Sequence, residues 1–146
     1  MPGPIFVGSS YMSVSITRLN PPSLPDAGAA GYSQISIAMP GRLAFISGQV
    51  AWHRDGTPAP STFNEQAKLV VRNAKAALEA IGASANDLLM VRVYVVDLTE
   101  ERLGQLWPHV HDLLEGAQPS LTGIGVAALA APDLQLEIEM TVGLPS

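Results

Sequence analysis

The clearest pattern in the chain is a run of apolar residues at helical spacing between residues 62 and 81. Thr62 and Glu65 have the spacing of a capping box at the start of a helix. Gly82 follows the run and is a typical helix stop. The periodicity predicts an amphipathic helix with one buried face. That face is formed by Ala67, Val70, Val71, Ala74, Leu78 and Ile81.

A second helical pattern begins after Thr99 and ends at Gly116. Glu100 and Glu101 stand in its first turn, where negative charge is favourable. Pro108 lies too deep for a first-turn proline, so we expect a kink at this position. The apolar face consists of Leu103, Leu106, Val110 and Leu113.

Two further segments alternate apolar and polar side chains with a period of two, which predicts strands. In residues 88–96, Val91, Val93 and Val95 alternate with Arg92, Tyr94 and Val96. In residues 134–142, one side carries Leu134, Leu136, Ile138, Met140 and Val142, and the other carries Gln135, Glu137, Glu139 and Thr141.

Three shorter β patterns complete the set. Residues 32–37 and 42–47 flank the turn sequence Met39-Pro40-Gly41, and together they predict a β-hairpin. Residues 119–129, PSLTGIGVAAL, carry no charge and also favour a strand. Gly123 and Gly125 are unusual there, because glycine in a strand costs conformational entropy and packs nothing.

The order β-β-α-β-α-β-β predicts an α+β fold in which a sheet carries two helices on one face. We expect residues 15–146 to form a single domain. The first 14 residues, MPGPIFVGSSYMSV, have no element pattern and contain the second methionine of the chain, Met12. We expect residues 1–14 to be a disordered N-terminal tail or residues added by cloning.

Composition narrows the function classes. The 146 residues carry a formal net charge of −5, and no basic stripe is visible, so we expect no nucleic-acid partner. The chain has no cysteine, which excludes disulfides, thiol nucleophiles and thiolate metal sites. No apolar run is long enough to span a membrane, and no secretory signal is evident, so we expect a cytoplasmic protein without a membrane partner.

Glu137 and Glu139 are the first candidates for chemistry. Two positions apart on a strand, they project from the same face, where paired carboxylates can divide acid and base roles. The alternative is an ordinary solvated outer face. His53 stands in a polar loop, and His109 and His111 point to opposite sides of a helix, so we expect no metal site.

Taken together, these segments resemble the RidA (YjgF) family of reactive-intermediate deaminases, also described as L-PSP endoribonucleases. The resemblance extends from about residue 15 to residue 142. It rests on RLNPPSLP at 18–25, Tyr32 with Gln34, FISGQV at 45–50, NAKAALEAIGA at 73–83, VRVYVVDL at 91–98 and LEIE at 136–139.

The resemblance implies a chorismate-mutase-like α+β fold, with two helices on one face of a mixed β-sheet. It also implies a homotrimer with ligand clefts between neighbouring subunits. Family members hydrolyse small imines or enamines, such as 2-aminoacrylate, to a keto acid and ammonia, and they need no cofactor.

Site residues carry over from the family position by position. Glu137 corresponds to the glutamate that holds the hydrolytic water, and Gln105 replaces an asparagine of the second helix. The other expected substrate-binding positions are Tyr32, Ser47, Gly48, Leu121, Thr122 and Gly123.

One position departs from the pattern. Active deaminases read P-x-R-S where this chain has Pro119-Ser120-Leu121-Thr122, and their arginine clamps the substrate carboxylate. Losing a bidentate guanidinium–carboxylate pair weakens recognition of an acid by roughly ten- to several-hundred-fold. Arg18, Arg42, Arg54 and Arg92 are the candidates to replace the lost charge.

Three functions therefore stay open. The first is a cofactor-free hydrolase or deaminase for a substrate that lacks the usual carboxylate or holds it elsewhere, with Glu137 orienting water and Leu121 forming an apolar wall. The second is a non-catalytic ligand-binding member of the family. The third is an endoribonuclease, which the acidic balance and the absence of a histidine pair disfavour.

Overall fold

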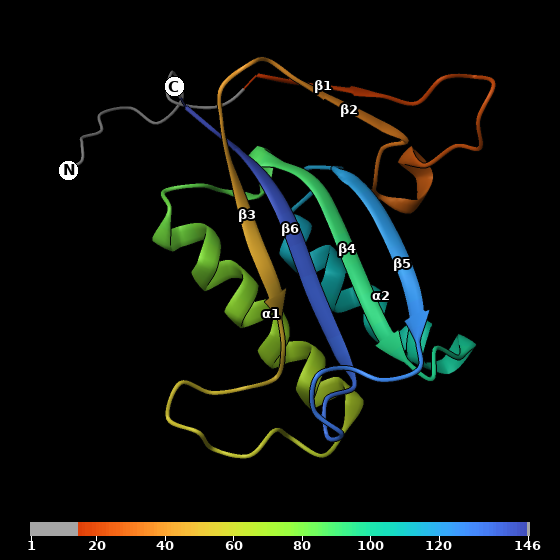
Figure 1. Ribbon diagram of the computed structural model, residues 1–146. Coiled ribbons are helices and arrows are strands. Elements are labelled where there is room, and N and C mark those ends of the chain that lie inside the picture. The colour runs from red at the N-terminus through yellow and green to blue at the C-terminus, as the bar shows by residue number, and fades with distance from the viewer. Residues whose placement is uncertain (1–14, 146) are drawn as a thin grey trace.

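The computed structural model describes residues 15–145, and the expected tail at residues 1–14 lies outside this range. A four-stranded sheet with the strand order β3-β6-β4-β5 forms one layer, and helices α1 and α2 cover one of its faces (Figure 1). A separate pair of short strands, β1 and β2, lies at one end of the sheet. The predicted α+β class, with two helices on a mixed sheet, is confirmed. The strands are β1 (Ile16–Leu19), β2 (Ile35–Ala38), β3 (Arg42–Gln49), β4 (Leu88–Val96), β5 (Ser120–Val126) and β6 (Leu136–Leu144). The helices are α1 (Phe63–Ala80), α2 (Glu100–Leu114) and the short 3₁₀ turns η2 (Gly28–Ala30) and η3 (Ala85–Asp87).

Strand β6 is the centre of the sheet, pairing antiparallel with β3 on one side and with β4 on the other. Strand β5 pairs parallel with β4, because α2 carries the chain back across the sheet before β5 begins. Alternate residues of β6 face the helices and are at most 1% exposed: Leu136, Ile138, Met140 and Val142. The opposite face of the sheet, called the open face below, is covered by no helix in the described chain.

Both predicted helices form, and both begin at the expected caps. The Thr62 hydroxyl accepts a hydrogen bond from the Glu65 amide, and the Thr99 hydroxyl accepts one from the Arg102 amide. Capping of this kind stabilises a helix by about 1 kcal/mol. Helix α2 continues through Pro108 to Leu114.

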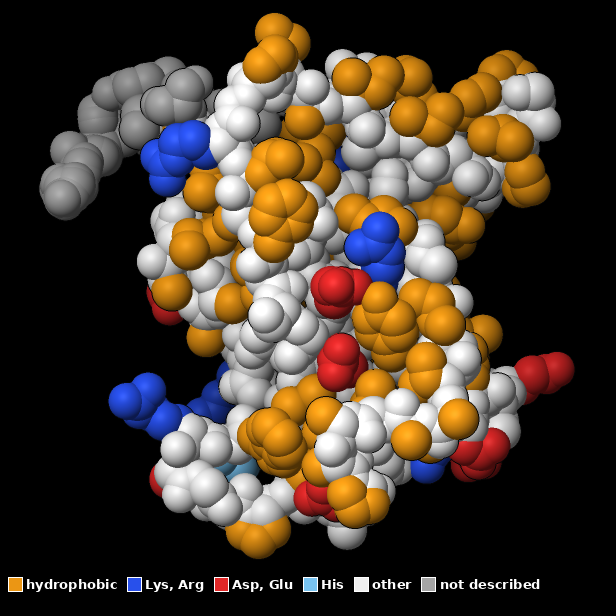
Figure 2. All heavy atoms as spheres, viewed as in Figure 1, with side chains coloured by type: hydrophobic (Ala, Val, Ile, Leu, Met, Phe, Trp, Pro, Cys, Tyr) orange, Lys and Arg blue, Asp and Glu red, His pale blue; other side chains and the backbone are white. Residues whose placement is uncertain are grey.

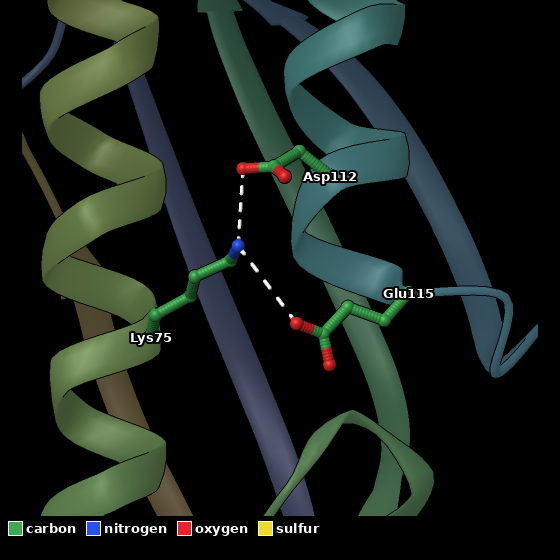
Figure 3. Close-up of polar contacts among 3 residues, drawn as sticks. All are labelled: Lys75, Asp112 and Glu115. Carbon is green, nitrogen blue, oxygen red and sulfur yellow. Dashed lines mark hydrogen bonds and ion pairs between the residues drawn. The ribbon is translucent and has the colours of Figure 1, made fainter.

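The two helices are linked on their outer surface by ion pairs. Lys75 of α1 donates to Asp112 of α2 at 3.1 Å and lies 3.9 Å from Glu115, just beyond the end of α2 (Figure 3). All three side chains are more than one-third exposed, so each pair contributes at most about 1 kcal/mol. The packing of α1 against α2 therefore depends mainly on the apolar core beneath them.

The predicted hairpin between residues 32–37 and 42–47 is wrong. Strand β2 pairs with β1, a strand that the sequence pattern did not indicate, and β3 pairs with β6. The turn at Met39–Gly41 carries the chain from the small sheet to the large one. Short alternating runs show that a strand forms, but they do not show which partner it takes.

Hydrogen bonds fasten the β1–β2 unit to the start of β4 and β5. Arg18 donates to the backbone oxygens of Leu88 at 2.9 Å and Asn86 at 3.0 Å. The hydroxyls of Ser36 and Ser120 lie 2.8 Å apart. One of the four arginines considered as replacement cations is thus committed to a structural role.

Candidate functional site

The open face of the sheet holds a cluster of charged and hydroxyl side chains at its centre. Register places Glu139 beside Arg92, and Glu137 beside Tyr94, across the β6–β4 pair. Figure 2 looks onto this face and shows acidic and basic side chains next to one another between hydrophobic ones. The predicted projection of both glutamates from one face is therefore confirmed by the strand geometry.

Glu137 lies directly against the backbone of Gly48 in β3. A Cβ atom built on Gly48 would overlap the carboxylate end of Glu137, at its Cγ, Cδ and Oε2 atoms. The β3–β6 register shifts between Ile46 and Gln49, which is the signature of a β-bulge at Ser47 and Gly48. The bulge and the missing side chain together create the space that the carboxylate fills.

The environment of Glu137 disfavours its charged form. Burial raises the pKa of this carboxyl above its ordinary value, and the negative charge of Glu139 raises the pKa further. Within residues 15–145, the Glu137 side chain has no hydrogen bond or ion pair. Its oxygens are therefore available to a water molecule or a ligand.

Glu139, in contrast, has a protein partner. The Tyr94 hydroxyl donates to Glu139 Oε1 at 2.6 Å, and this hydrogen bond is the main reason that the pKa of Tyr94 is raised. Arg92 Nη1 lies 3.7 Å from the same oxygen. Two carboxylates at neighbouring positions on one face thus have different surroundings, which is the condition for different roles in proton transfer.

A shallow pocket of about 310 Å³ adjoins these groups. Phe45, 76% exposed, forms part of its wall. The full lining is Phe45, Ile46, Ser47, Arg92, Glu139, Met140 and Thr141. The pocket therefore combines an aromatic surface, hydroxyl groups, one cation and one carboxylate.

The expected site residues fall into two groups. Glu137 and Gly48 are in contact, Ser47 lines the adjoining pocket, and Thr122 is paired with Arg92 and so lies on the same open face. Leu121 is paired with the buried Val91 and packs against the core.

Leu121 therefore lies on the helix-covered face, opposite to Glu137. Gly123, paired with Val93, lies on that face too, and a Cβ built on it would meet nothing within 4 Å. Gln105 is a half-buried residue of α2, and Tyr32 lies between η2 and β2. Within one chain, the structure does not bring these four residues to the Glu137 cluster.

Tyr94 and Phe45 belong to the open-face cluster but were not predicted as site residues, and Arg92 was considered only as one of four candidates to replace the lost charge. The signal was present in part, because residues 88–96 alternate and place Arg92 and Tyr94 opposite the valines. What was missing was the pairing partner, since only the β4–β6 register shows that both lie beside the glutamates.

Residues 15–145 contain no group of three or more His, Cys, Asp or Glu side chains placed to hold a metal ion. Neither helix in that range has the length and apolar character required to cross a bilayer.

Comparison with known proteins places this geometry in context. A family model described as Endoribonuclease L-PSP matches residues 24–143. The chain is 31% identical over 99 residues to the RutC family protein YjgH of Escherichia coli (strain K12), covering 67% of this chain and 74% of that protein. It is 29% identical over 100 residues to "Putative reactive intermediate deaminase TdcF" of the same organism, covering 68% of this chain and 77% of that protein.

A solved structure agrees over most of the chain. The crystal structure of YyfB from Yersinia pestis, described as a protein of unknown function of the conserved Rid protein family, is 33% identical to this chain. It superposes with a TM-score of 0.82 and covers 88% of this chain and 98% of its own. The similarity therefore extends through the strands that carry the open-face cluster.

Proposed function

The chain belongs to the RidA/YjgF family, also described as endoribonuclease L-PSP, and on that premise we propose that it is a cofactor-free hydrolase of a small imine or enamine. The observation that carries this proposal is the Glu137 carboxyl, which is held over Gly48 with a raised pKa and without a protein partner in the described chain. A related protein bears a name that describes a reactive intermediate deaminase.

Glu137 fits the role of a group that moves protons between water and the substrate nitrogen. In its charged form it accepts a proton from a water molecule as the water oxygen attacks the C=N carbon, and it gives this proton to the nitrogen to form a carbinolamine. It then takes the proton of the new hydroxyl and delivers it to the amine nitrogen as the C–N bond breaks, so that the products are a carbonyl compound and ammonia. An enamine enters this sequence as its imine tautomer. A carboxyl with a raised pKa is suited to both steps near neutral pH.

We further propose that the protein acts as a homotrimer with ligand clefts between subunits. Apolar side chains that are unusually exposed in one chain support this assembly, among them Phe45 at 76%, Met39 at 65% and Ile37 at 51%. In such clefts a second subunit would bring Tyr32, Gln105, Leu121 and Gly123 toward a Glu137 cluster. The Phe45→Glu variant should reduce the assembly to monomers in light scattering, whereas a monomeric wild type would contradict this part of the proposal.

The reaction is tested by measuring ammonia release from 2-aminoacrylate and from larger or uncharged enamines. We expect turnover on at least one substrate, and we expect Glu137→Gln to reduce it at least a hundredfold. Glu79→Gln, an exposed change on α1, is the matched control. No turnover on any substrate, with ligand binding unchanged by Glu137→Gln, would contradict the proposal.

A second candidate, a non-catalytic ligand-binding protein, is favoured by one observation. Leu121 stands where the family resemblance expects the substrate-binding arginine, and it packs against the core. If Leu121→Arg creates 2-aminoacrylate deaminase activity, the scaffold is catalytically competent and only the clamp is missing. If Leu121→Arg and the wild type are both inactive but bind ligand, the binding function is supported.

We propose a cytoplasmic protein whose domain spans residues 15–146 and whose ligand is a small molecule, with no metal and no nucleic-acid partner. The net charge of −5 supports the last point. RNA cleavage by the pure protein, abolished by Glu137→Gln, would show that the endoribonuclease description applies instead.

A further inference from the structure

We infer that Arg92 binds a carboxylate group of the ligand on the open face of the sheet, next to the Glu137 cluster. This inference rests on the proposed function and identifies the substrate class: a small acid whose carboxylate is held on β4 rather than at position 121. The chain has six arginines, and their surroundings differ.

Two arginines already use their guanidinium groups within the fold. Arg18 donates to the backbone oxygens of Leu88 and Asn86. Arg102 donates to the backbone oxygen of Val96 and to Gln135 Oε1 at 2.7 Å, and it also lies 5.0 Å from the Phe63 ring centroid. Neither group can turn to a ligand without breaking these contacts.

Three others lie on exposed surface. Arg42 begins β3, Arg54 lies in the loop after it, and Arg72 lies on the outer side of α1. The charge of an exposed guanidinium is screened by water and salt, so it binds a single small carboxylate weakly.

Arg92 differs from the other five arginines. It is half-buried and lines the 310 Å³ pocket beside Phe45 and Ser47. Within the described chain its guanidinium donates no hydrogen bond, and its nearest carboxylate oxygen, Glu139 Oε1, lies at 3.7 Å. The Tyr94 hydroxyl holds that oxygen at 2.6 Å, so Arg92 and Glu139 do not form a bidentate pair.

The donors of Arg92 are therefore available in a formed pocket. A guanidinium has a planar fork of N–H donors that matches a carboxylate. Hydroxyls of Ser47 and Thr141, which also line the pocket, can supply further donors to the same anion. Thr122 stands beside Arg92 on the neighbouring strand.

The position of Glu137 limits the size and the charge of the ligand. Arg92 is paired with Glu139, and Glu137 is the next residue of β6 on this face, so Arg92 and Glu137 are diagonal neighbours about 7–8 Å apart. That separation suits a ligand with only a few bonds between its carboxylate and its reacting carbon. Two nearby glutamates also repel dianions, which favours a monocarboxylate with a neutral or cationic nitrogen over a phosphate.

The test compares binding of pyruvate, pyruvamide and inorganic phosphate to the full-length protein by calorimetry or ligand-observed NMR. The variants are Arg92→Gln and the matched control Arg42→Gln. We expect the wild type to bind pyruvate more tightly than phosphate. Arg92→Gln should weaken pyruvate at least tenfold and leave pyruvamide unchanged, and Arg42→Gln should change neither.

Several results would overturn the inference: no pyruvate binding by the wild type, equal affinity for phosphate, or equal losses for pyruvate and pyruvamide in Arg92→Gln. If Arg92→Gln does not fold, Arg92→Lys decides, because it keeps the charge without the fork and should bind pyruvate with intermediate affinity. The two proposals also fail separately. If pyruvate binding depends on Arg92 but no substrate is turned over, the carboxylate site is supported and the hydrolase proposal is contradicted. If turnover depends on Glu137 but not on Arg92, the hydrolase proposal is supported and the carboxylate site is contradicted.

Discussion

The carboxylate of Glu137 occupies the space over Gly48 in which any other residue would place its Cβ atom. A glycine on β3 thus fixes where an acidic side chain of β6 can lie, although the two positions are 89 residues apart in the chain, 137 minus 48. The contact joins the two strands at the β-bulge, next to the pocket lined by Ser47 and Arg92.

Gly48→Ala should therefore displace the Glu137 side chain. The overlapping atoms are the flexible end of a side chain, so rotation of Glu137 relieves the clash, and the free energy of unfolding should fall by less than about 1 kcal/mol. Turnover should fall at least tenfold, because the carboxyl leaves its position over the strand. Urea denaturation and steady-state kinetics measure the two effects.

Gly41→Ala is the control for this change, since a Cβ at Gly41 meets only ordinary contacts, the nearest at 3.5 Å. If Gly48→Ala and Gly41→Ala reduce turnover equally, the overlap with Glu137 has no catalytic consequence.

The raised pKa of Glu137 predicts how stability depends on pH. The pKa of Glu137 in the folded state exceeds its unfolded-state pKa of about 4.3. The stability that this group contributes is therefore fully present only at a pH below the unfolded-state pKa. Its contribution is lost as the pH rises through the folded pKa. The Glu137→Gln variant should therefore become more stable relative to the wild type as the pH increases. Urea denaturation of both proteins from pH 4 to 8 measures this difference in the free energy of unfolding.

Glu139→Gln provides an internal check on the cause of this shift. It removes the second of the two causes, the neighbouring negative charge, while burial remains. When Glu137→Gln is compared with its parent in the Glu139→Gln background, the pH-dependent difference in the free energy of unfolding should therefore become smaller without disappearing. A difference that is independent of pH, or that grows toward acid, would contradict the raised pKa.

Gln66 should be essential for stability although it is polar. It is 1% exposed, donates to the backbone oxygens of Pro60 at 2.9 Å and Asp133 at 2.7 Å, and accepts from the Gln135 amide at 2.9 Å. Gln66→Leu leaves these three backbone groups without their partner, at a cost of about 3 kcal/mol in the free energy of unfolding.

Lys68→Leu, an exposed change two residues further along α1, should alter the free energy of unfolding by no more than about 0.5 kcal/mol. Urea denaturation of both variants measures the difference. Equal values for the two would mean that the Gln66 hydrogen bonds contribute no net stability.

Arg18→Met should loosen the attachment of the β1–β2 unit to the large sheet. The guanidinium supplies hydrogen bonds to Leu88 and Asn86, each worth about 1.5–3 kcal/mol because the donor is charged. Amide hydrogen exchange in residues 16–19 and 35–38 should accelerate at least tenfold, while β4 and β6 keep their protection.

Arg42→Met serves as the comparison, because Arg42 is exposed at the start of β3. Uniform acceleration through β4 and β6 in the Arg18 variant would show that this arginine stabilises the whole fold rather than one attachment.

Local periodicity predicted the elements whose burial pattern is contained within them. Helix α1 and strands β4 and β6 bury one regular face each, so a window of 9 to 18 residues contains the signal. The predicted hairpin was wrong because strand pairing, unlike burial, is not determined within one short segment. Pairing of β3 with β6 is a long-range choice, and a short strand carries no record of its partner.

The candidate site shows the same limit. Alternation placed Glu137 and Glu139 on one face, but the proximity of Arg92, Tyr94 and Gly48 depends on register between distant strands. Leu121 is instructive, because its position in a motif gives no information about which face of β5 it occupies. Only its pairing with Val91 places it on the core side.

Strand β6 lies between β3 and β4, yet it is made after both of them. During synthesis, β3 has no neighbour in the large sheet until residues 136–144 have left the ribosome. Before that point the growing chain can form its helices and the parallel β4–β5 pair, but the apolar surface of the sheet stays incomplete and open to wrong partners. Folding of this domain should therefore be completed only once β6 has emerged, and a chain released before that point should be a substrate for chaperones or proteases.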